Sequence, residues 1–410
     1  MLFDMKKTAQ KQKKWIKTRH SIVKKIVHVL LYPYCKIKYG LKPEKLKEKP
    51  ERQYLVLYNH QTAFDQFFVG MLFKQHLYYV ASEDIFSNGF SSKLIKYLVN
   101  PIPIKKQSTD VRAIMTCIKV VKEGGSVAIA PEGNRTYSGK TEYMSQSIAS
   151  LARKLALPIA FVKIEGGYGT HPRWSDVIRR GKTSCRVSRV LEPREYSDMS
   201  DSELFDFIKN ELHVNEANAD NEYFHKRSAE YLERAIYVCP KCALSTFESK
   251  NDEIKCKKCG ISARYTSKKE LISESEAFKF RFVSDWYDYQ KKFILSLDLA
   301  PYYEKPMYDE RAMIREVIPY SKKNVIYEDA GISLYANKIL VSCGAEKEEY
   351  LFDDISSLAV LGKNKLNIYL GKRVFQLKGD KRFNALKYVH VFYRYKQILK
   401  GEENGDFLGL

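Results

Sequence analysis

Strand-like and helix-like segments alternate between residues 53 and about 195, and this alternation limits the possible folds more than any other feature of the sequence. Short apolar runs predict strands, and amphipathic patterns between them predict helices. The alternation is typical of an α/β domain with helices flanking a parallel or mixed sheet. The expected strands are 53–58, 77–81, 101–104, 126–130, 158–164 and 185–191, and the expected helices are 65–75, 91–99, 111–123 and 145–155.

Two polar clusters follow strands of this predicted sheet. The first, residues 59–65, comes after the apolar run 54–58, and the second, residues 130–136, comes after the apolar run 126–130. Open α/β sheets bind their ligands at the carboxyl ends of the strands. We therefore expect the two clusters to meet at one edge of the sheet.

The first cluster contains a histidine and an aspartate, His60 and Asp65, five positions apart. On one regular helix their side chains would point about 140° apart. If His60 lies in the turn and Asp65 in the first turn of the next helix, the two can form a hydrogen bond. A carboxylate in that position fixes the tautomer of the imidazole and raises its basicity. The same spacing also arises in purely structural pairs, so it does not by itself identify a base.

The second cluster adds a turn that carries an acid and an arginine. Pro131 ends the strand, Gly133 permits a tight turn, and Glu132 and Arg135 are displayed beside each other. Such a turn is usually a surface feature. Arg135, however, has the rigid donor fork that suits a phosphate, and His60 can serve as a base. Together they indicate a phosphate-bearing hydroxyl compound held beside a general base.

The two clusters resemble the motifs of the lysophosphatidate and glycerol-3-phosphate acyltransferase family. His60-x4-Asp65 is similar to the first family motif, and Pro131–Thr136 is similar to the third. Residues 101–106 are the counterpart of a basic block between them, and the run 157–162 matches an apolar segment opened by proline. The four blocks occur in order across roughly residues 20–215.

The chain departs from the family pattern in three places. Ala130 stands where the family usually has phenylalanine, Asn134 replaces a threonine, and lysine replaces the arginine of the second block. Lysine keeps the positive charge but lacks the bidentate fork, which leaves the identity of the acceptor open.

The resemblance implies an enzyme like 1-acylglycerol-3-phosphate O-acyltransferase, acting in phospholipid biosynthesis. Such an enzyme moves a fatty acyl group from acyl-coenzyme A or acyl carrier protein to the hydroxyl of a lysophospholipid-type acceptor, and 1-acylglycerol-3-phosphate would give phosphatidate. His60 would be the general base and Asp65 would orient it. The residues that would position the acceptor are Glu132, Gly133, Arg135, Lys105 and Lys106.

The net charge of +21 indicates an anionic partner, either a nucleic acid or an acidic membrane surface. Residues 1–50 hold fifteen basic and three acidic side chains, with apolar residues at helical spacing among the lysines from Trp15 onward. This pattern is typical of a helix in a membrane interface, and also of a helix packed on its own domain with a solvated basic face. We expect contact with an anionic membrane and no nucleic acid partner.

No uninterrupted apolar run reaches about 18 residues, and the basic start of the chain is not followed by an apolar core with a cleavage site. We therefore expect neither a transmembrane helix nor a secretory signal. The expected location is the cytoplasm, at the inner face of the membrane.

A pair of Cys-x2-Cys motifs follows the first domain. Cys239 and Cys242 are separated from Cys256 and Cys259 by thirteen residues, and Gly260 closes the second motif. The spacing predicts a zinc ribbon that holds one Zn²⁺, and two disulfides are the competing interpretation. A reducing compartment favours the metal. Four thiolates leave no open coordination position, so the expected role of the zinc is structural.

From residue 324 the apolar period changes to two, which predicts short strands followed by a terminal helix that includes His390. We expect His390 to be packed in the core. The whole arrangement is similar to a small barrel of the pleckstrin-homology type. The expected domains are a membrane-contact segment 1–50, a catalytic domain 51–235, a zinc ribbon 236–270, a helical linker 271–320 and a β-rich domain 321–400.

Two other functions remain open at this point. Zinc ribbons and high positive charge also occur together in nucleic-acid-binding proteins. The ribbon here is only mildly basic, however, and the densest charge lies on the apolar-striped segment near the N-terminus. A non-catalytic acyltransferase-like domain that serves as a membrane scaffold is the other alternative. The intact His60, Asp65, Glu132 and Arg135 favour the enzyme.

Overall fold

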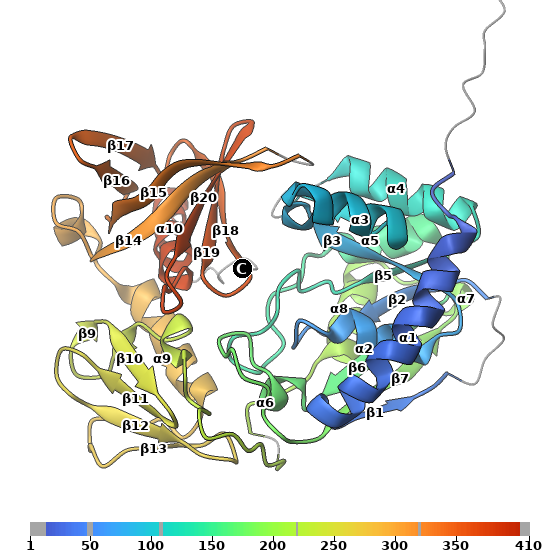
Figure 1. The fold of residues 1–410 in the computed structure, drawn as a ribbon, viewed down its shortest axis with the longest axis horizontal. Coiled ribbons are helices and arrows are strands. Elements are labelled where there is room, and N and C mark those ends of the chain that lie inside the picture. Colours follow the sequence, from blue (N-terminus) through green and yellow to red (C-terminus); the bar gives the residue numbers. More distant parts are fainter. Residues whose placement is uncertain (1–13, 47–51, 106–109, 219, 319–320, 402–410) are drawn as a thin grey trace, which may run out of the picture.

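The computed structural model describes residues 14–46, 52–105, 110–218, 220–318 and 321–401. Figure 1 shows two bodies side by side: an α/β body from the first half of the chain, and a second body that contains a small ribbon and a β-rich unit. Lys106 lies outside the described residues.

The first body is built on a seven-stranded sheet in the order β1-β7-β6-β2-β5-β3-β4. Strands β6, β2, β5, β3 and β4 run parallel, while β7 is antiparallel to β6 and parallel to β1. The expected mixed α/β sheet is therefore confirmed. The strands are β1 (Leu41–Glu44), β2 (Leu55–Tyr58), β3 (Leu77–Ser82), β4 (Ile102–Ile104), β5 (Ser126–Ile129), β6 (Ile159–Glu165) and β7 (Thr183–Leu191).

Helices cover both faces of this sheet because the central strand is apolar on both sides. Leu55 and Leu57 pack with α4, α5 and α8, whereas Val56 and Tyr58 pack with α1 and α2. A strand buried on both faces reads as a continuous apolar run, which is the pattern of residues 54–58. The helices are α1 (Thr18–Tyr39), α2 (Asp65–Leu72), α3 (Phe90–Leu98), α4 (Val111–Lys122), α5 (Ser147–Leu155), α6 (Gly167–Thr170), α7 (Pro193–Tyr196) and α8 (Asp201–Leu212), with a 3₁₀ turn η1 (Glu83–Ser87).

The segment after α8 is less helical than its charged pattern indicates. Residues 213–231 form no helix within the described part, and only a 3₁₀ turn, η2 (Leu232–Arg234), precedes the ribbon. The charged pattern of this segment, which is typical of a helix, therefore corresponds to a helix only as far as Leu212. Tertiary contacts hold this segment instead: Leu232 and Arg234 are buried, and Arg234 donates to the carbonyl of Trp174 (2.9 Å) and to Asp176 (2.8 Å).

A small antiparallel unit follows, where the ribbon was expected. Strands β10 to β13 form a four-stranded sheet, and β8 pairs with β9. Gly260 closes the second cysteine motif with a φ of +80°, a conformation that favours glycine. The strands are β8 (Val238–Cys239), β9 (Ala243–Leu244), β10 (Phe247–Lys250), β11 (Glu253–Cys256), β12 (Ser262–Tyr265) and β13 (Leu271–Ile272).

The C-terminal unit is an antiparallel half-barrel closed by a helix. Its seven strands follow the order β17-β16-β15-β14-β20-β19-β18. The expected β-rich unit with a terminal helix is confirmed. The elements are α9 (Val283–Ser296), η3 (Ala300–Tyr302), β14 (Tyr308–Val317), β15 (Lys323–Leu334), β16 (Lys338–Cys343), β17 (Glu346–Leu351), β18 (Ile355–Leu361), β19 (Lys365–Leu370), β20 (Arg373–Gly379) and α10 (Leu386–Lys400).

One strand of the half-barrel was not expected. Strand β14 occupies residues 308–317 of the range 271–320 that was expected to be a helical linker, so only α9 fits that expectation. Its buried residues Tyr308, Ala312, Ile314 and Val317 are separated by charged side chains, and the strand is stabilised by pairing with β15 and β20.

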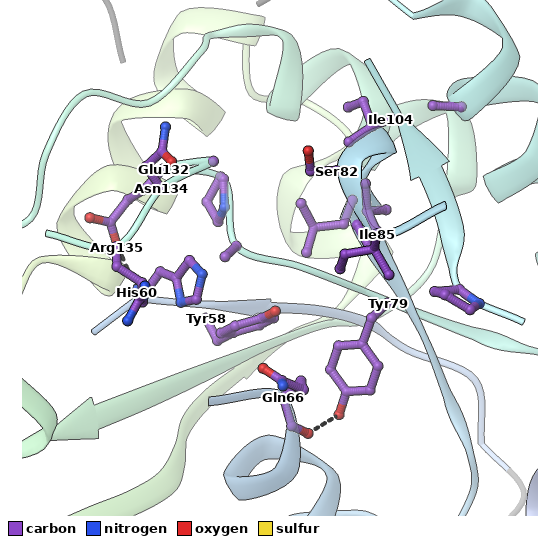
Figure 2. A pocket seen from close by; sticks show the side chains of 18 of the residues that line it. Tyr58, His60, Gln66, Tyr79, Ser82, Ile85, Ile104, Glu132, Asn134 and Arg135 are labelled. Atoms are coloured by element: carbon purple, nitrogen blue, oxygen red, sulfur yellow. Dashed lines mark hydrogen bonds between the residues drawn. The ribbon is translucent and has the colours of Figure 1, made fainter. Parts of the chain in front are cut away.

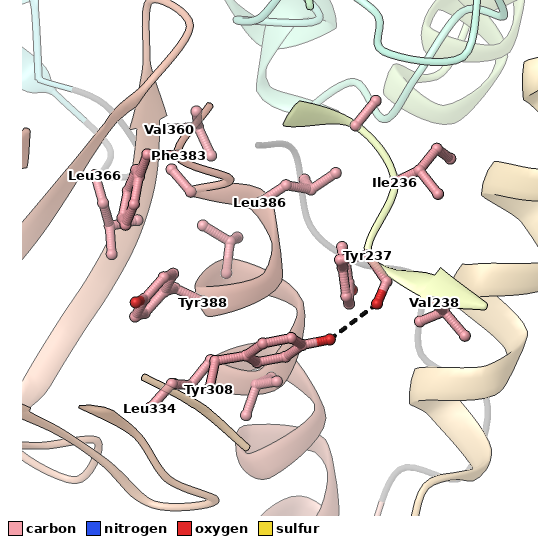
Figure 3. Packing of buried hydrophobic residues seen from close by; sticks show 14 of the residues in the cluster. Ile236, Tyr237, Val238, Tyr308, Leu334, Val360, Leu366, Phe383, Leu386 and Tyr388 are labelled. Atoms are coloured by element: carbon pink, nitrogen blue, oxygen red, sulfur yellow. Dashed lines mark hydrogen bonds between the residues drawn. The ribbon is translucent and has the colours of Figure 1, made fainter. Parts of the chain in front are cut away.

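One core joins the ribbon, α9 and the half-barrel. Its buried residues come from all three units, including Val238 of the ribbon, Trp286 of α9 and Leu366 of the half-barrel. Figure 3 shows a polar link inside this core, where the Tyr308 hydroxyl donates to the carbonyl of Tyr237 (2.9 Å). His390 is fully buried and its Nδ1 lies 2.6 Å from the Tyr237 hydroxyl, as expected for a packed helix residue. The second body therefore folds around a shared core.

Side chains also connect the two bodies. Lys323 on β15 forms an ion pair with Asp84 (2.7 Å), and the hydroxyl of Tyr369 on β19 donates to Glu83. From the first body, Arg173 donates to the carbonyls of Val360 (3.1 Å) and Gly362 (3.3 Å). Because Arg173 is only 2% exposed, these hydrogen bonds hold the tip of the β18–β19 hairpin against the α/β body.

Candidate functional site

A cavity of about 1150 Å³ lies at the carboxyl ends of the parallel strands. Residues that directly follow β2, β4 and β5 line it, among them His60, Lys105 and Arg135. Figure 2 shows His60, Arg135, Asn134 and Glu132 together on one side of this cavity. The parallel arrangement of β2 and β5 therefore brings the two polar clusters together, as their positions after the strands predict.

His60 lies in the turn after β2, and Asp65 is the first residue of α2. The Nδ1 atom of His60 lies 2.8 Å from Oδ2 of Asp65, which is the hydrogen bond that the five-residue spacing predicts. The Asp65 carboxylate also accepts from the backbone N–H of Gln61 (2.6 Å) and from the N–H (3.0 Å) and hydroxyl (2.7 Å) of Thr62. Asp65 is fully buried, so these bonds hold the carboxylate in one orientation and fix the imidazole ring.

The turn that carries His60 is also attached to the neighbouring strand β6. The side-chain amide of Asn59 donates to the Ile164 carbonyl (2.8 Å), and its oxygen accepts from the Ile164 N–H (2.7 Å). The side-chain oxygen of Gln61 accepts from the N–H of Tyr168 (3.0 Å). Sequence reasoning did not single out these roles of Asn59 and Gln61, because each depends on a partner more than a hundred positions away.

Glu132 contacts the backbone of the site. One carboxylate oxygen accepts from the N–H of His60 (2.9 Å), and the other accepts from the N–H of Glu142 (3.1 Å). The side chain is only 4% exposed. Burial raises the pKa of Glu132 to about 8. The negative charges of Glu142 and Asp65 raise this pKa further, whereas the two backbone N–H donors lower it. In this geometry Glu132 positions the loop of His60.

Arg135 presents an unsatisfied donor. Within the described residues, its Nη1 is buried and has no hydrogen-bond partner. Burial and the nearby Arg173 lower the pKa of Arg135 to about 10, so the guanidinium stays charged at neutral pH. A buried charged donor without a partner is costly, and an anionic group of a ligand would satisfy it. Arg135 is therefore the residue of the site best placed to bind an anion.

The remaining predicted acceptor residues differ in position. Gly133 is exposed with a φ of +67° and lines the cavity. Lys105 also lines the cavity, and its Nζ lies 5.7 Å from the ring centre of Tyr369 in the half-barrel. Lys106 lies outside the described residues.

Arg173 is a cavity residue that the motifs do not reveal. Its Nη1 donates to the Arg135 carbonyl (3.1 Å), and its guanidinium lies over the ring of Tyr137, with a centre distance of 4.4 Å. It thus supports Arg135 and contacts the half-barrel hairpin at the same time.

Cys239, Cys242, Cys256 and Cys259 gather at one end of the ribbon. Their sulfur atoms all lie within 4.8 Å of one another, and those of Cys239 and Cys259 are 3.6 Å apart. A tetrahedral Zn²⁺ with Zn–S bonds of about 2.3 Å requires sulfur atoms about 3.8 Å apart, so the four thiols fit one zinc ion. All eight cysteines of the chain are free thiols, and the alternative of two disulfides is not observed.

Comparison with known proteins agrees with the site. Residues 41–165 match the family model described as Acyltransferase. This region is therefore similar to that family. The match contains β1 to β6 and the residues His60, Asp65, Lys105, Glu132 and Arg135.

Two acyltransferases and one PH domain are also similar to parts of the chain. A 1-acyl-sn-glycerol-3-phosphate acyltransferase from Bacillus subtilis (strain 168) is 24% identical over 136 residues, or 33% of this chain. The chain covers 64% of that relative, just under two thirds of its length. The crystal structure of the 1-acyl-sn-glycerophosphate acyltransferase PlsC from Thermotoga maritima is 22% identical, with a TM-score of 0.38, and covers 47% of this chain and 75% of its own. The N-terminal PH domain of human ARAP2 gives a TM-score of 0.20 at 12% identity, covering 24% of this chain and 87% of its own.

The raised pKa of Glu132 predicts a measurable pH dependence of stability. Because its folded-state pKa is raised from 4.5 to about 8, the neutral carboxyl is the form that the folded protein favours. The stabilisation that the neutral Glu132 carboxyl gives the folded protein is complete below pH 4.5 and is lost as the pH rises toward 8. The stability of the wild type relative to Glu132→Gln, which does not titrate, should fall by up to about 1.4 kcal/mol per pH unit in that window.

Urea unfolding of both proteins at several pH values measures this difference. Glu328→Gln, a change at an exposed glutamate on β15, is the control and should show no such trend. A difference between wild type and Glu132→Gln that stays constant across the window would contradict the prediction.

Proposed function

We propose that this protein is an acyltransferase that moves a fatty acyl group from an acyl thioester to the hydroxyl of a lysophospholipid-type acceptor. The preferred acceptor is 1-acylglycerol-3-phosphate, which would become phosphatidate. The observation that carries the proposal is the His60–Asp65 pair, joined at 2.8 Å, in a cavity that also contains the unpartnered donor of Arg135. The family match over residues 41–165 and the name of the Bacillus relative support it.

His60 would act as the general base. Its Nδ1 is bound to Asp65, so Nε2 would take the proton from the acceptor hydroxyl. The hydroxyl oxygen then attacks the thioester carbonyl, a C–O bond forms, and the C–S bond breaks. The imidazolium returns its proton to the departing sulfur, which leaves as a thiol. The Asp65 carboxylate stabilises the imidazolium during the transfer.

Arg135 would hold the acceptor phosphate beside His60. A charged, planar donor fork in a water-poor cavity binds phosphate well. Apolar side chains such as Ile85, Ile104 and Leu151 also line the cavity, which suits an acyl chain. Tyr79 is held by a hydrogen bond from its hydroxyl to the Gln66 carbonyl (2.7 Å), so this part of the wall is ordered (Figure 2).

Replacement of His60 by alanine tests the proposal. The His60→Ala variant should lose about 100- to 10,000-fold in kcat because no other group replaces the base. Acyl transfer to a panel of lyso-acceptors, followed by mass spectrometry, measures the loss. The variant should keep the wild-type circular dichroism, since Gln61 and Thr62 still donate hydrogen bonds to the buried Asp65. Retained turnover in a folded variant would overturn the assignment.

We also propose that Cys239, Cys242, Cys256 and Cys259 hold one structural Zn²⁺. The four thiols would leave no open coordination position, so the ion would stabilise the fold and take no part in acyl transfer. Because the ribbon shares a core with α9 and the half-barrel, the metal would stabilise the whole second body.

Metal analysis of two matched variants tests this site. The wild type should contain about one zinc per chain, and Cys259→Ser should lose most of it and unfold at lower urea. Cys343→Ser, a change at a similarly half-buried cysteine on β16, should keep the zinc. Equal zinc content in Cys259→Ser and Cys343→Ser would contradict the proposed centre.

We further propose that α1 contacts an anionic membrane. None of the helices within the described residues is long and apolar enough to span a bilayer. Helix α1 nevertheless exposes apolar side chains beside its lysines, a combination that suits an interfacial helix. These exposed residues are Ile22 (54%), Ile26 (54%), Val29 (69%), Leu30 (68%) and Ile37 (76%).

Co-sedimentation with vesicles that contain anionic lipid tests this contact. The double change Val29→Ser and Leu30→Ser should weaken binding about tenfold or more, because each side chain would no longer enter the apolar layer. The matched change Val325→Ser and Ile326→Ser, at exposed residues of β15, should leave binding unchanged. Binding to DNA at physiological salt without binding to vesicles would favour the nucleic-acid alternative.

A further inference from the structure

The half-barrel supplies part of the wall of the cavity that contains His60. Figure 1 shows strands β18 and β19 facing the α/β body. Residues of these strands and of the hairpin between them line the cavity together with residues of the first body. The half-barrel residues in the lining are Ser356, Ser357, Leu361, Gly362, Lys365 and Tyr393.

A cluster of cations lies where the two bodies meet. Lys365 on β19 lines the cavity, and its Nζ lies 3.6 Å from Asp84. The same carboxylate is paired more closely with Lys323 (2.7 Å). Arg315 belongs to this cluster through Gln376, which donates to Asp84 (3.2 Å) and accepts from Arg315 (2.6 Å). Two lysines thus share the charge of Asp84, and Arg315 is linked to it through Gln376.

The other nearby carboxylates have partners of their own. Glu83 accepts from the Tyr369 hydroxyl, and Asp110 accepts from the backbone N–H groups of Lys105 (2.9 Å) and of Arg112 (3.0 Å). Burial and the neighbouring Lys323 and Arg315 lower the pKa of Lys365, against the effect of Asp84. An additional anion beside Lys365 would relieve this crowding of positive charge.

We propose that Lys365 forms a second phosphate subsite in the cavity, whose lining also includes Lys105 of the acyltransferase domain. Both lysines line the cavity, and the ring of Tyr369, from the same strand as Lys365, lies 5.7 Å from the Nζ of Lys105. Arg135 and His60 line the same cavity after other strands of the sheet. The half-barrel would therefore take part in substrate binding.

This subsite rests on the proposed function, because that reaction uses two phosphate-bearing substrates. The acceptor carries one phosphate, and coenzyme A or the prosthetic group of a carrier protein carries others. Arg135 can hold only one of these groups beside the base. A second cationic point on the opposite body would hold the other. The phosphate at Lys365 thus belongs either to the coenzyme A or carrier protein of the acyl donor, or to the acceptor. Binding measurements with one probe for each source distinguish the two.

Calorimetric binding to the purified full chain tests the subsite without requiring any chemistry. The probes are coenzyme A, pantetheine, which lacks the phosphates, and glycerol 3-phosphate. Lys365→Gln should weaken the binding of coenzyme A about tenfold or more and leave the binding of pantetheine unchanged. Lys365→Arg, which keeps the positive charge, should bind coenzyme A with most of the wild-type affinity. If Lys365→Gln weakens the binding of glycerol 3-phosphate instead, the subsite is confirmed and the phosphate that it binds is that of the acceptor.

Two control variants separate binding from loosening of the contact between the bodies. Lys323→Gln removes the closer ion pair with Asp84, and Lys323 does not line the cavity. Lys372→Gln changes an exposed lysine in the turn after β19. Both should bind every probe as the wild type does, within about threefold.

The proposal is overturned if Lys365→Gln weakens neither phosphate probe, or if Lys323→Gln weakens them equally. Failure of the wild type to bind either phosphate probe would overturn it as well. These results are independent of the acyltransferase assignment, which falls only if His60→Ala keeps its turnover. The binding test of the subsite and the turnover test of His60→Ala can therefore have different outcomes.

Discussion

The hydrogen bond between His60 and Asp65 is the interaction on which the site depends. It requires a fully buried carboxylate, and that carboxylate is stable there because Gln61 and Thr62 supply further donors. Those donors are in place because Asn59 ties the turn after β2 to β6. Parallel pairing of β2 with β5 and β6 brings the three segments together. The sheet therefore determines the orientation of one imidazole ring.

Much of the first body could be predicted from the sequence, because a sheet buried on both faces gives apolar runs that are easy to recognise. The hydrogen bond between His60 and Asp65 could be predicted from their spacing. The two backbone hydrogen bonds of Glu132 could not, since their donors lie outside the turn that carries Glu132. Strand β14 was missed because its pairing with β15 and β20, and not its own pattern, stabilises it.

The contribution of the half-barrel to the cavity could not be predicted from local sequence patterns. Lys365 and Asp84 are far apart in the chain, and only the folded structure shows that they meet at the cavity that contains His60. Arg173 reinforces this meeting, because it supports Arg135 and also binds the hairpin of the half-barrel. The ribbon and α9 share a core with that half-barrel. A zinc centre in the ribbon would therefore stabilise one wall of the cavity from a distance.

Product analysis of the wild-type protein tests the central claim most directly. The purified full chain is incubated with an acyl thioester and 1-acylglycerol-3-phosphate, and products are identified by mass spectrometry. The account predicts phosphatidate and free thiol in equal amounts, because each attack by the hydroxyl releases one thiol. Thiol release by hydrolysis alone, or no reaction with any lyso-acceptor, would contradict it.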